Sequence, residues 1–222
     1  MNDLVNLSNV ALRKSQYDEI ILDGSGSMQH IWLDMLKSID SYVETLTWDQ
    51  LDTQLRMSIF TTGPDNIDLI ARDCPISQWV PLLKDIPGSP FQRTPLYDAI
   101  NLMGRRLAKL DPERAAVTIA SDGEENGSLV TDLTQARAVL DWCRAKGWQV
   151  TLLGVDFNNS MTAEALGFGP QSATGVQKAL MSDAMKAIAH KRARYGKTGE
   201  KMQFSDGERT QFGGYLNGPA EQ

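Results

Sequence analysis

The chain of 222 residues contains only two cysteines and two histidines. Cys74 and Cys143 belong neither to a Cys-x-x-Cys pair nor to a cluster with metal-ligand spacing, which argues against a cysteine-based metal site. We expect both cysteines to be buried, reduced thiols, and one disulfide between them is the alternative. His30 and His190 lack the spacing of a metal site or a catalytic dyad. We therefore expect both histidines on partly exposed helix surfaces.

Long apolar runs are also lacking. No stretch approaches the roughly 18 apolar residues that cross a bilayer, and residues 1–13 do not resemble a signal peptide. These features predict a cytoplasmic protein without a membrane partner. Positive charge is in deficit, because the formal net charge is -6 and the pI is about 5.0. This balance argues against nucleic acid as a partner, although residues 186–201 form a local basic stretch.

The rest of the composition, with 41% hydrophobic and 23% charged residues, is that of an ordinary soluble domain. We predict an N-terminal extension over residues 1–17 and a single domain over 18–195. Beyond Tyr195 the composition becomes polar, so residues 196–222 are expected to form a tail that is flexible or packed on a partner. Self-association through this tail, with Asp206, Glu208 and Glu221 as acidic donors, is one expectation.

Short apolar runs alternate with longer amphipathic ones, which predicts an α/β fold. The expected strands are residues 19–23, 55–61, 67–71, 115–120 and 148–155. The expected helices are residues 28–46, 76–86, 96–110, 131–146 and 175–194. We therefore predict a three-layer, Rossmann-like sandwich with a mostly parallel sheet, one antiparallel edge strand at 67–71, and helices on both faces. Thr94 is the expected N-cap of the helix at 96–110, with Pro95 at its first position.

Oxygen-rich loops follow two of the predicted strands and precede one helix. The first loop, Asp23-Gly24-Ser25-Gly26-Ser27, follows the first strand. The second loop, Arg93-Thr94-Pro95-Leu96-Tyr97-Asp98, precedes the middle helix, and the third, Ser121-Asp122-Gly123-Glu124, follows a later strand. Ligands of open α/β sheets bind at the carboxyl ends of strands, and hard divalent cations prefer oxygen ligands. Hydroxyl and carboxylate groups from these loops could supply such ligands.

The three loops, in this order and spacing, resemble the metal-ion-dependent adhesion site (MIDAS) of von Willebrand factor A (vWA) domains over roughly residues 18–193. The segments 21–28 and 121–126 look like those of stand-alone bacterial and phage-borne vWA proteins. The resemblance implies that Ser25 and Ser27 bind Mg²⁺ (or Mn²⁺ or Ca²⁺) directly and that Thr94 binds it directly or through water. Asp23 and Asp122 would act largely through water and by holding ligands in place.

The same resemblance implies a non-catalytic protein-interaction module whose metal receives an Asp or Glu of a partner protein. The expected partner-binding rim consists of Gly24, Met28, Arg93, Gly123 and Glu124. Arg93 departs from the small residues that many family members carry before the threonine, and it could crowd the site or attract a carboxylate. Glu124 and Glu125 are otherwise interpreted as solvated loop carboxylates.

Two alternatives remain open. The same oxygen-rich site could serve a metal-dependent phosphoesterase, although no general base of suitable type is evident and Arg93 is the one candidate for gripping phosphate. The chain could also be a metal-free scaffold. A dinucleotide loop is disfavoured because Gln29 stands where its third glycine would be, and a P-loop because no Gly-Lys-Ser/Thr follows. A haloacid dehalogenase-type phosphatase is disfavoured because Ser25 stands where its second aspartate would be.

Overall fold

The computed structural model describes residues 16–60, 67–82, 93–122, 125–155 and 160–213. These residues form one six-stranded sheet in the order β3-β2-β1-β4-β5-β6. The strands are β1 (Gln16–Asp23), β2 (Gln54–Phe60), β3 (Ile67–Pro75), β4 (Arg114–Ser121), β5 (Gln149–Val155) and β6 (Ala173–Val176). All neighbours pair in parallel except β2 and β3. The mostly parallel sheet with an antiparallel edge strand is therefore confirmed.

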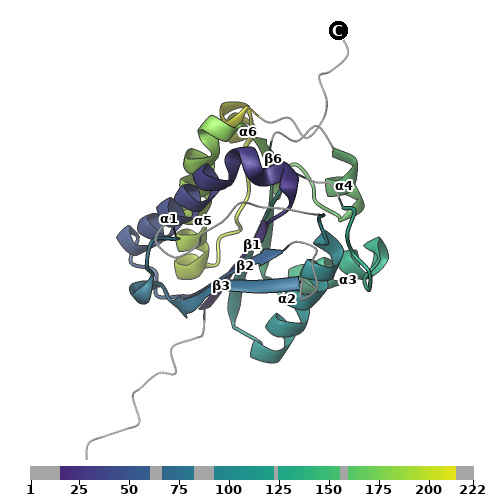
Figure 1. Ribbon diagram of the computed structural model, residues 1–222. Coiled ribbons are helices and arrows are strands. Elements are labelled where there is room, and N and C mark those ends of the chain that lie inside the picture. Colours follow the sequence, from purple (N-terminus) through teal and green to yellow (C-terminus); the bar gives the residue numbers. More distant parts are fainter. Residues whose placement is uncertain (1–15, 61–66, 83–92, 123–124, 156–159, 214–222) are drawn as a thin grey trace, which may run out of the picture.

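Helices cover both faces of the sheet, as the alternating pattern predicted (Figure 1). The helices are α1 (Trp32–Trp48), α2 (Leu96–Leu110), α3 (Leu133–Ala145), α4 (Ser160–Ala165), α5 (Met181–Thr198) and α6 (Asp206–Phe212). One apolar cluster joins the sheet to α1, α5 and α6, and a second joins the opposite face to α2, α3 and α4. Burial of both sheet faces explains why the central strands are continuous apolar runs.

Successive residues of β1 illustrate the two faces. Asp18 pairs with Arg192 of α5, and both side chains are almost fully buried. The next residue, Glu19, points to the opposite face and pairs with Arg106 of α2 and Arg56 of β2. A buried charge is tolerated only when it is paired and hydrogen-bonded. These pairs therefore tie α5 and α2 to the central strand, one on each side.

The predicted helix at residues 76–86 is wrong in its first part. Ile76–Gln78 form a single turn of 3-10 helix, and residues 83–86 lie outside the described residues. Asp40 of α1 accepts hydrogen bonds from the Trp79 indole and from the backbone N–H of Leu82. The apolar spacing in this segment therefore reflects packing of an irregular loop against α1.

Two other boundaries differ from the prediction. The last large helix begins at Met181 and not at residue 175, because Ala173–Val176 pairs with β5 as an edge strand. Pro95, and not Thr94, is the N-cap residue of α2, and it makes no side-chain capping hydrogen bond. Thr94 is instead bonded to a neighbouring loop.

Residues 196–213 do not form a tail, so the predicted boundary at residue 195 is wrong. Helix α5 continues to Thr198, and Met202, Phe204 and Phe212 are buried in the cluster shared with α1 and α5. Gly213 forms a bridge to Val176 of β6. The isolated apolar residues of this polar segment are therefore core residues of the same domain.

The acidic donors expected in that segment are engaged locally. Glu208 pairs with Lys191 and completes the capping box of α6 with Ser205, while Asp206 pairs with Arg209. Glu221 lies outside the described residues. The described part of this segment therefore gives no support to self-association through a free acidic tail.

Cys74 and Cys143 are both free thiols. Cys143 is buried, and burial raises its pKa to about 12, which favours the neutral thiol. Cys74 is only partly buried, so the expectation of two buried thiols holds for one of them. Within the described ranges, no helix is both long enough and apolar enough to span a membrane.

Candidate metal centre

Asp23 organises the first loop from the end of β1. Its Oδ2 accepts a 2.6 Å hydrogen bond from the Ser121 hydroxyl at the end of β4, and its Oδ1 accepts a 2.9 Å bond from the backbone N–H of Ser25. Because β1 and β4 are adjacent parallel strands, their carboxyl ends meet at one edge of the sheet. The Asp23 side chain therefore joins two of the three predicted loops.

Ser25 and Ser27 lie on the turn that Asp23 supports. Their Oγ atoms are 3.0 Å apart, so both hydroxyls face the same space. Ser25 is buried, whereas Ser27 is exposed. Ser25 also precedes a 3-10 helix at Gly26–Ile31, which leads into α1. Two hydroxyl ligands of one cation would need this proximity, and their role as ligands stays a prediction.

Thr94 connects the second loop to the third. Its backbone N–H donates to Oδ1 of Asn126 at 2.9 Å, and its carbonyl accepts from the backbone N–H groups of Asn126 and Gly127 at 3.1 Å. The Thr94 side chain is almost fully buried. These bonds hold the start of α2 against the segment that follows β4, which also carries Asp122.

Asp122 directly follows Ser121 at the end of β4. Its Oδ1 is buried and has no hydrogen-bond partner among the residues that the structure describes. A buried carboxylate oxygen without a partner is costly, because it has lost its hydration without a replacement. A bound cation, or water held by a cation, is the kind of group that would satisfy this atom.

The raised pKa of Asp23 is also consistent with a bound cation. Burial raises the pKa of Asp23 from 3.8 to about 6, hydrogen bonds from Ser121 and Ser25 oppose that rise, and the negative charge of Asp122 adds to it. A positive charge close to Asp23 would favour its ionised form. The residues present fit a divalent cation.

The character of the ligand set restricts the choice of metal. Within the described residues, no group of three or more His, Cys, Asp or Glu side chains is placed to hold a metal ion. A cation at this edge would therefore depend on hydroxyl oxygens and water as well as on Asp23 and Asp122. Such oxygen-rich sites suit Mg²⁺, Mn²⁺ or Ca²⁺ and not thiophilic metals.

Asp98 and Glu125 have roles that the sequence did not predict. The carboxylate of Glu125 accepts backbone N–H groups from Tyr97, Gly127 and Ser128 at 2.7–2.9 Å, and the Ser128 hydroxyl at 2.8 Å. The prediction of a solvated loop carboxylate is therefore wrong for Glu125. A carboxylate near the start of a helix could have indicated this role, because backbone N–H groups are free there.

The Asp98 carboxylate is almost fully buried and serves the same loop from the first turn of α2. It accepts hydrogen bonds from the backbone N–H groups of Leu129, Val130 and Thr131, at 2.7, 3.2 and 2.6 Å. The backbone N–H of Asp98 in turn donates to the Ser128 hydroxyl. Residues 125–131 and the beginning of α2 thus form one hydrogen-bonded unit.

The predicted partner-binding rim is only partly described. Met28 is fully buried in the core beneath the loop, so its assignment to the rim is wrong. Gly24 is also buried, whereas Arg93 is exposed beside Thr94. Gly123 and Glu124 lie outside the described residues. Met28 belongs inside because it begins the apolar face that continues into α1.

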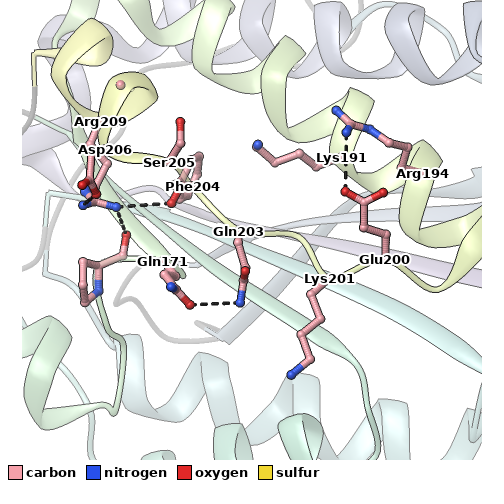
Figure 2. A pocket seen from close by; sticks show the side chains of 12 residues that line it. Gln171, Lys191, Arg194, Glu200, Lys201, Gln203, Phe204, Ser205, Asp206 and Arg209 are labelled. Carbon is pink, nitrogen blue, oxygen red and sulfur yellow. Dashed lines mark hydrogen bonds and ion pairs between the residues drawn. The ribbon is translucent and has the colours of Figure 1, made fainter.

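A separate pocket of about 780 Å³ lies between α5 and residues 199–209 (Figure 2). Lys191, Arg194 and Arg209, which line it, pair with Glu208, Glu200 and Asp206. Lys191 and Arg194 of the basic stretch at residues 186–201 are therefore paired with carboxylates of the same domain.

The six-stranded sheet with its covering helices is similar to the fold of several solved structures. The "von Willebrand factor type A from Catenulispora acidiphila" superposes with a TM-score of 0.58 at 12% sequence identity, over 81% of this chain and 43% of that chain. This chain has the vWA fold. The pilus adhesin SpaC from Lactobacillus rhamnosus GG gives a TM-score of 0.64 at 10% identity, over 83% of this chain and 30% of that chain.

A third similar structure, the manganese-loaded TRAP protein of Plasmodium vivax, has a TM-score of 0.54 at 14% identity, over 78% of this chain and 72% of that chain. This chain spans less than half the length of the SpaC and Catenulispora proteins. No protein-family model matches the chain, and a search of curated proteins gives no significant match. The likeness therefore concerns the fold.

Proposed function

We propose that this vWA domain is a non-catalytic protein-interaction module that binds an acidic residue of a partner protein through a divalent cation. Ser25, Ser27 and Thr94 would hold the cation with their hydroxyls, while Asp23 and Asp122 would hold it mainly through water. The cation would supply a positive centre that accepts one more anionic oxygen. Mg²⁺ is the expected ion, with Mn²⁺ or Ca²⁺ as substitutes.

The unpartnered Oδ1 of Asp122 is the observation that carries this proposal. It lies in the loop after β4, which hydrogen bonds connect both to the Asp23 loop and, through Asn126, to Thr94. Neutral hydroxyls contribute no negative charge, so a cation bound here would keep a strong attraction for an external carboxylate. The manganese-loaded TRAP protein, which has a similar fold, supports the idea that a domain of this fold can carry a divalent cation.

Arg93 fits the same function. Its exposed side chain lies next to Thr94, and a guanidinium near the metal would attract an acidic partner over a distance of several ångströms. A phosphoesterase would need an additional group to activate water. A cytoplasmic location and a protein partner, with neither membrane nor nucleic acid as the target, complete the proposal.

Metal binding is tested by titrating Mg²⁺ into chelator-treated protein, with calorimetry and thermal unfolding as readouts. Wild-type protein should bind and be stabilised, by about 2.7 kcal/mol at a free Mg²⁺ concentration 100 times the dissociation constant. The Ser25→Ala/Ser27→Ala and Asp122→Asn variants should lose both effects. Ser77→Ala, which removes an exposed hydroxyl outside the three loops, is the matched control and should respond like the wild type.

The Asp122→Asn variant distinguishes loss of ligand from loss of fold. Because the substitution removes a charge whose Oδ1 has no partner, it should not lower the unfolding temperature of the metal-free protein. Equal Mg²⁺ responses in wild-type and variant proteins would contradict the proposed site. Hydrolysis of a phosphate ester in Mn²⁺ that disappears in Asp122→Asn would instead favour the phosphoesterase alternative.

A further inference from the structure

Two neighbouring apolar side chains stand out on the surface near the candidate metal centre. Leu129 is 91% exposed and Val130 is 75% exposed. Among the described residues, the other exposed large apolar side chains (Leu33, Trp48, Val80 and Leu110) do not adjoin one another in sequence. Isolated exposed apolar residues are ordinary, but an adjacent pair beside a site is typical of an interaction surface.

The backbone beneath this pair is held firmly. The buried carboxylate of Asp98 accepts hydrogen bonds from the backbone N–H groups of both Leu129 and Val130. On either side, Glu125 binds the N–H groups of Gly127 and Ser128, and Asp98 also binds that of Thr131. The two side chains are therefore presented on a fixed backbone, which lowers the entropy lost when a partner covers them.

The hydrogen bonds also place this pair beside the metal-site loops. Gly127, two residues before Leu129, donates its N–H to the carbonyl of Thr94. Asp98, whose carboxylate binds the backbone of the pair, lies in the first turn of α2, which begins two residues after Thr94. The loop that carries Leu129 and Val130 is therefore tied to the segment that carries Thr94.

We propose that Leu129 and Val130 form an apolar contact that selects partner segments in which an apolar side chain lies close to the metal-binding Asp or Glu. This inference rests on the proposed function, because it assumes that a carboxylate occupies the cation. The occupant is a protein segment with both groups. The carboxylate complements the cation and the exposed Arg93, and the apolar side chain covers the pair.

The test uses displayed short peptides with a central Asp and randomised neighbours, selected on the full chain in Mg²⁺ and eluted with chelator. The wild type should enrich peptides with Leu, Ile, Val or Phe near the Asp. The Leu129→Ser/Val130→Ser variant should still yield chelator-released peptides but without apolar enrichment. Both substituted side chains are exposed, so this variant should keep the fold and the Mg²⁺ affinity of the wild type.

A selected peptide is then made synthetically and titrated against each protein in Mg²⁺. Its dissociation constant should rise about tenfold or more in the double variant, as expected for removal of apolar contacts from an interface. Leu110→Ser is the matched control, because Leu110 is exposed at the opposite end of α2 from Thr94. This control should leave the dissociation constant unchanged.

The outcomes separate the two proposals. Chelator-released peptides with the same flanking preferences on wild-type and double-variant protein would overturn the apolar contact and leave the metal-dependent function intact. Failure to obtain any chelator-released peptide from the wild type would count against the proposed function itself, and against this inference with it. Loss of affinity in the Leu110→Ser control as large as in the double variant would also overturn the assigned contact.

Discussion

At the scale of single residues, the properties of the candidate site come from two carboxylates that have buried oxygen atoms. Asp23 is fully buried and Asp122 has a buried oxygen without a partner. In the metal-free protein the burial of Asp23 opposes its ionisation, and in the loaded protein a cation would favour the ionised form of Asp23. The unusual pKa of Asp23 therefore links metal binding to pH.

This link predicts how the stability of metal-free protein depends on pH. The pKa of Asp23 is raised from 3.8 to about 6 in the folded state, so its neutral form is favoured on folding. That contribution is fully present below pH 3.8 and is lost as pH rises through about 6. Relative to Asp23→Asn, the wild type should lose about 3 kcal/mol of unfolding free energy across this window.

Urea unfolding in chelator at pH values between 4 and 7 measures this difference. The comparison with Asp23→Asn is needed because other buried carboxyls, such as Asp18, also titrate abnormally and contribute to both proteins. Saturating Mg²⁺ should remove much of the loss near pH 7. Unfolding free energies that change with pH in the same way for both proteins would contradict the raised pKa of Asp23.

At the scale of elements, helix α2 and the loop after β4 act as one unit. Asp98 and Glu125 connect them with carboxylate-to-backbone hydrogen bonds, and Thr94 joins the same loop through Asn126. Hydrogen bonds to charged groups are stronger than neutral ones. The position of Thr94 relative to Asp122 therefore depends on residues that need not touch a metal themselves.

Replacement of Asp98 tests this coupling. Asp98→Ala should lower the free energy of unfolding by about 3 kcal/mol, because the backbone N–H groups of residues 129–131 lose their acceptor. The Mg²⁺ affinity should fall as well, since the Thr94 loop is no longer fixed. Urea unfolding and calorimetry measure the two effects, with Asp183→Ala in the exposed first turn of α5 as the control. Loss of stability with unchanged Mg²⁺ affinity would limit Asp98 to a structural role.

At the scale of the whole molecule, the segment after α5 completes the domain. It returns along the sheet edge beside β6 and places α6 against the same core (Figure 1). Phe204 and Phe212 pack edge to face with ring centroids 6.3 Å apart. The bridge between Gly213 and Val176 thereby pairs part of the free edge of β6, which limits pairing of that edge with other chains.

Truncation of one of these rings should reveal its role in the core. Phe212→Ala should lower the unfolding free energy by about 3–5 kcal/mol, because the side chain is 1% exposed and leaves a cavity. Gln211→Ala, at the exposed neighbouring position, should change it by less than about 0.5 kcal/mol. Urea unfolding of both variants makes the comparison. Equal stabilities would mean that α6 contributes little to the domain.

The sequence alone was sufficient for most of the central fold. Short apolar runs predicted the five longer strands, and amphipathic runs with a period of about 3.6 predicted α1, α2 and α3, because burial on both faces or on one face leaves a different pattern. The convergence of the Asp23 loop with Ser121 and Asp122 also followed from sequence, since the ends of neighbouring parallel strands must meet. These features depend on local pattern and on simple rules of sheet topology.

Only the tertiary structure decided the remaining features. The burial of Met28, the structural role of Glu125 and the domain character of residues 196–213 depend on contacts between segments distant in sequence. A short edge strand such as β6 and a seven-residue helix such as α6 carry too few residues to show periodicity. Their apolar residues look isolated in the sequence, and their partners become evident only when α1, α5 and the sheet edge are assembled around them.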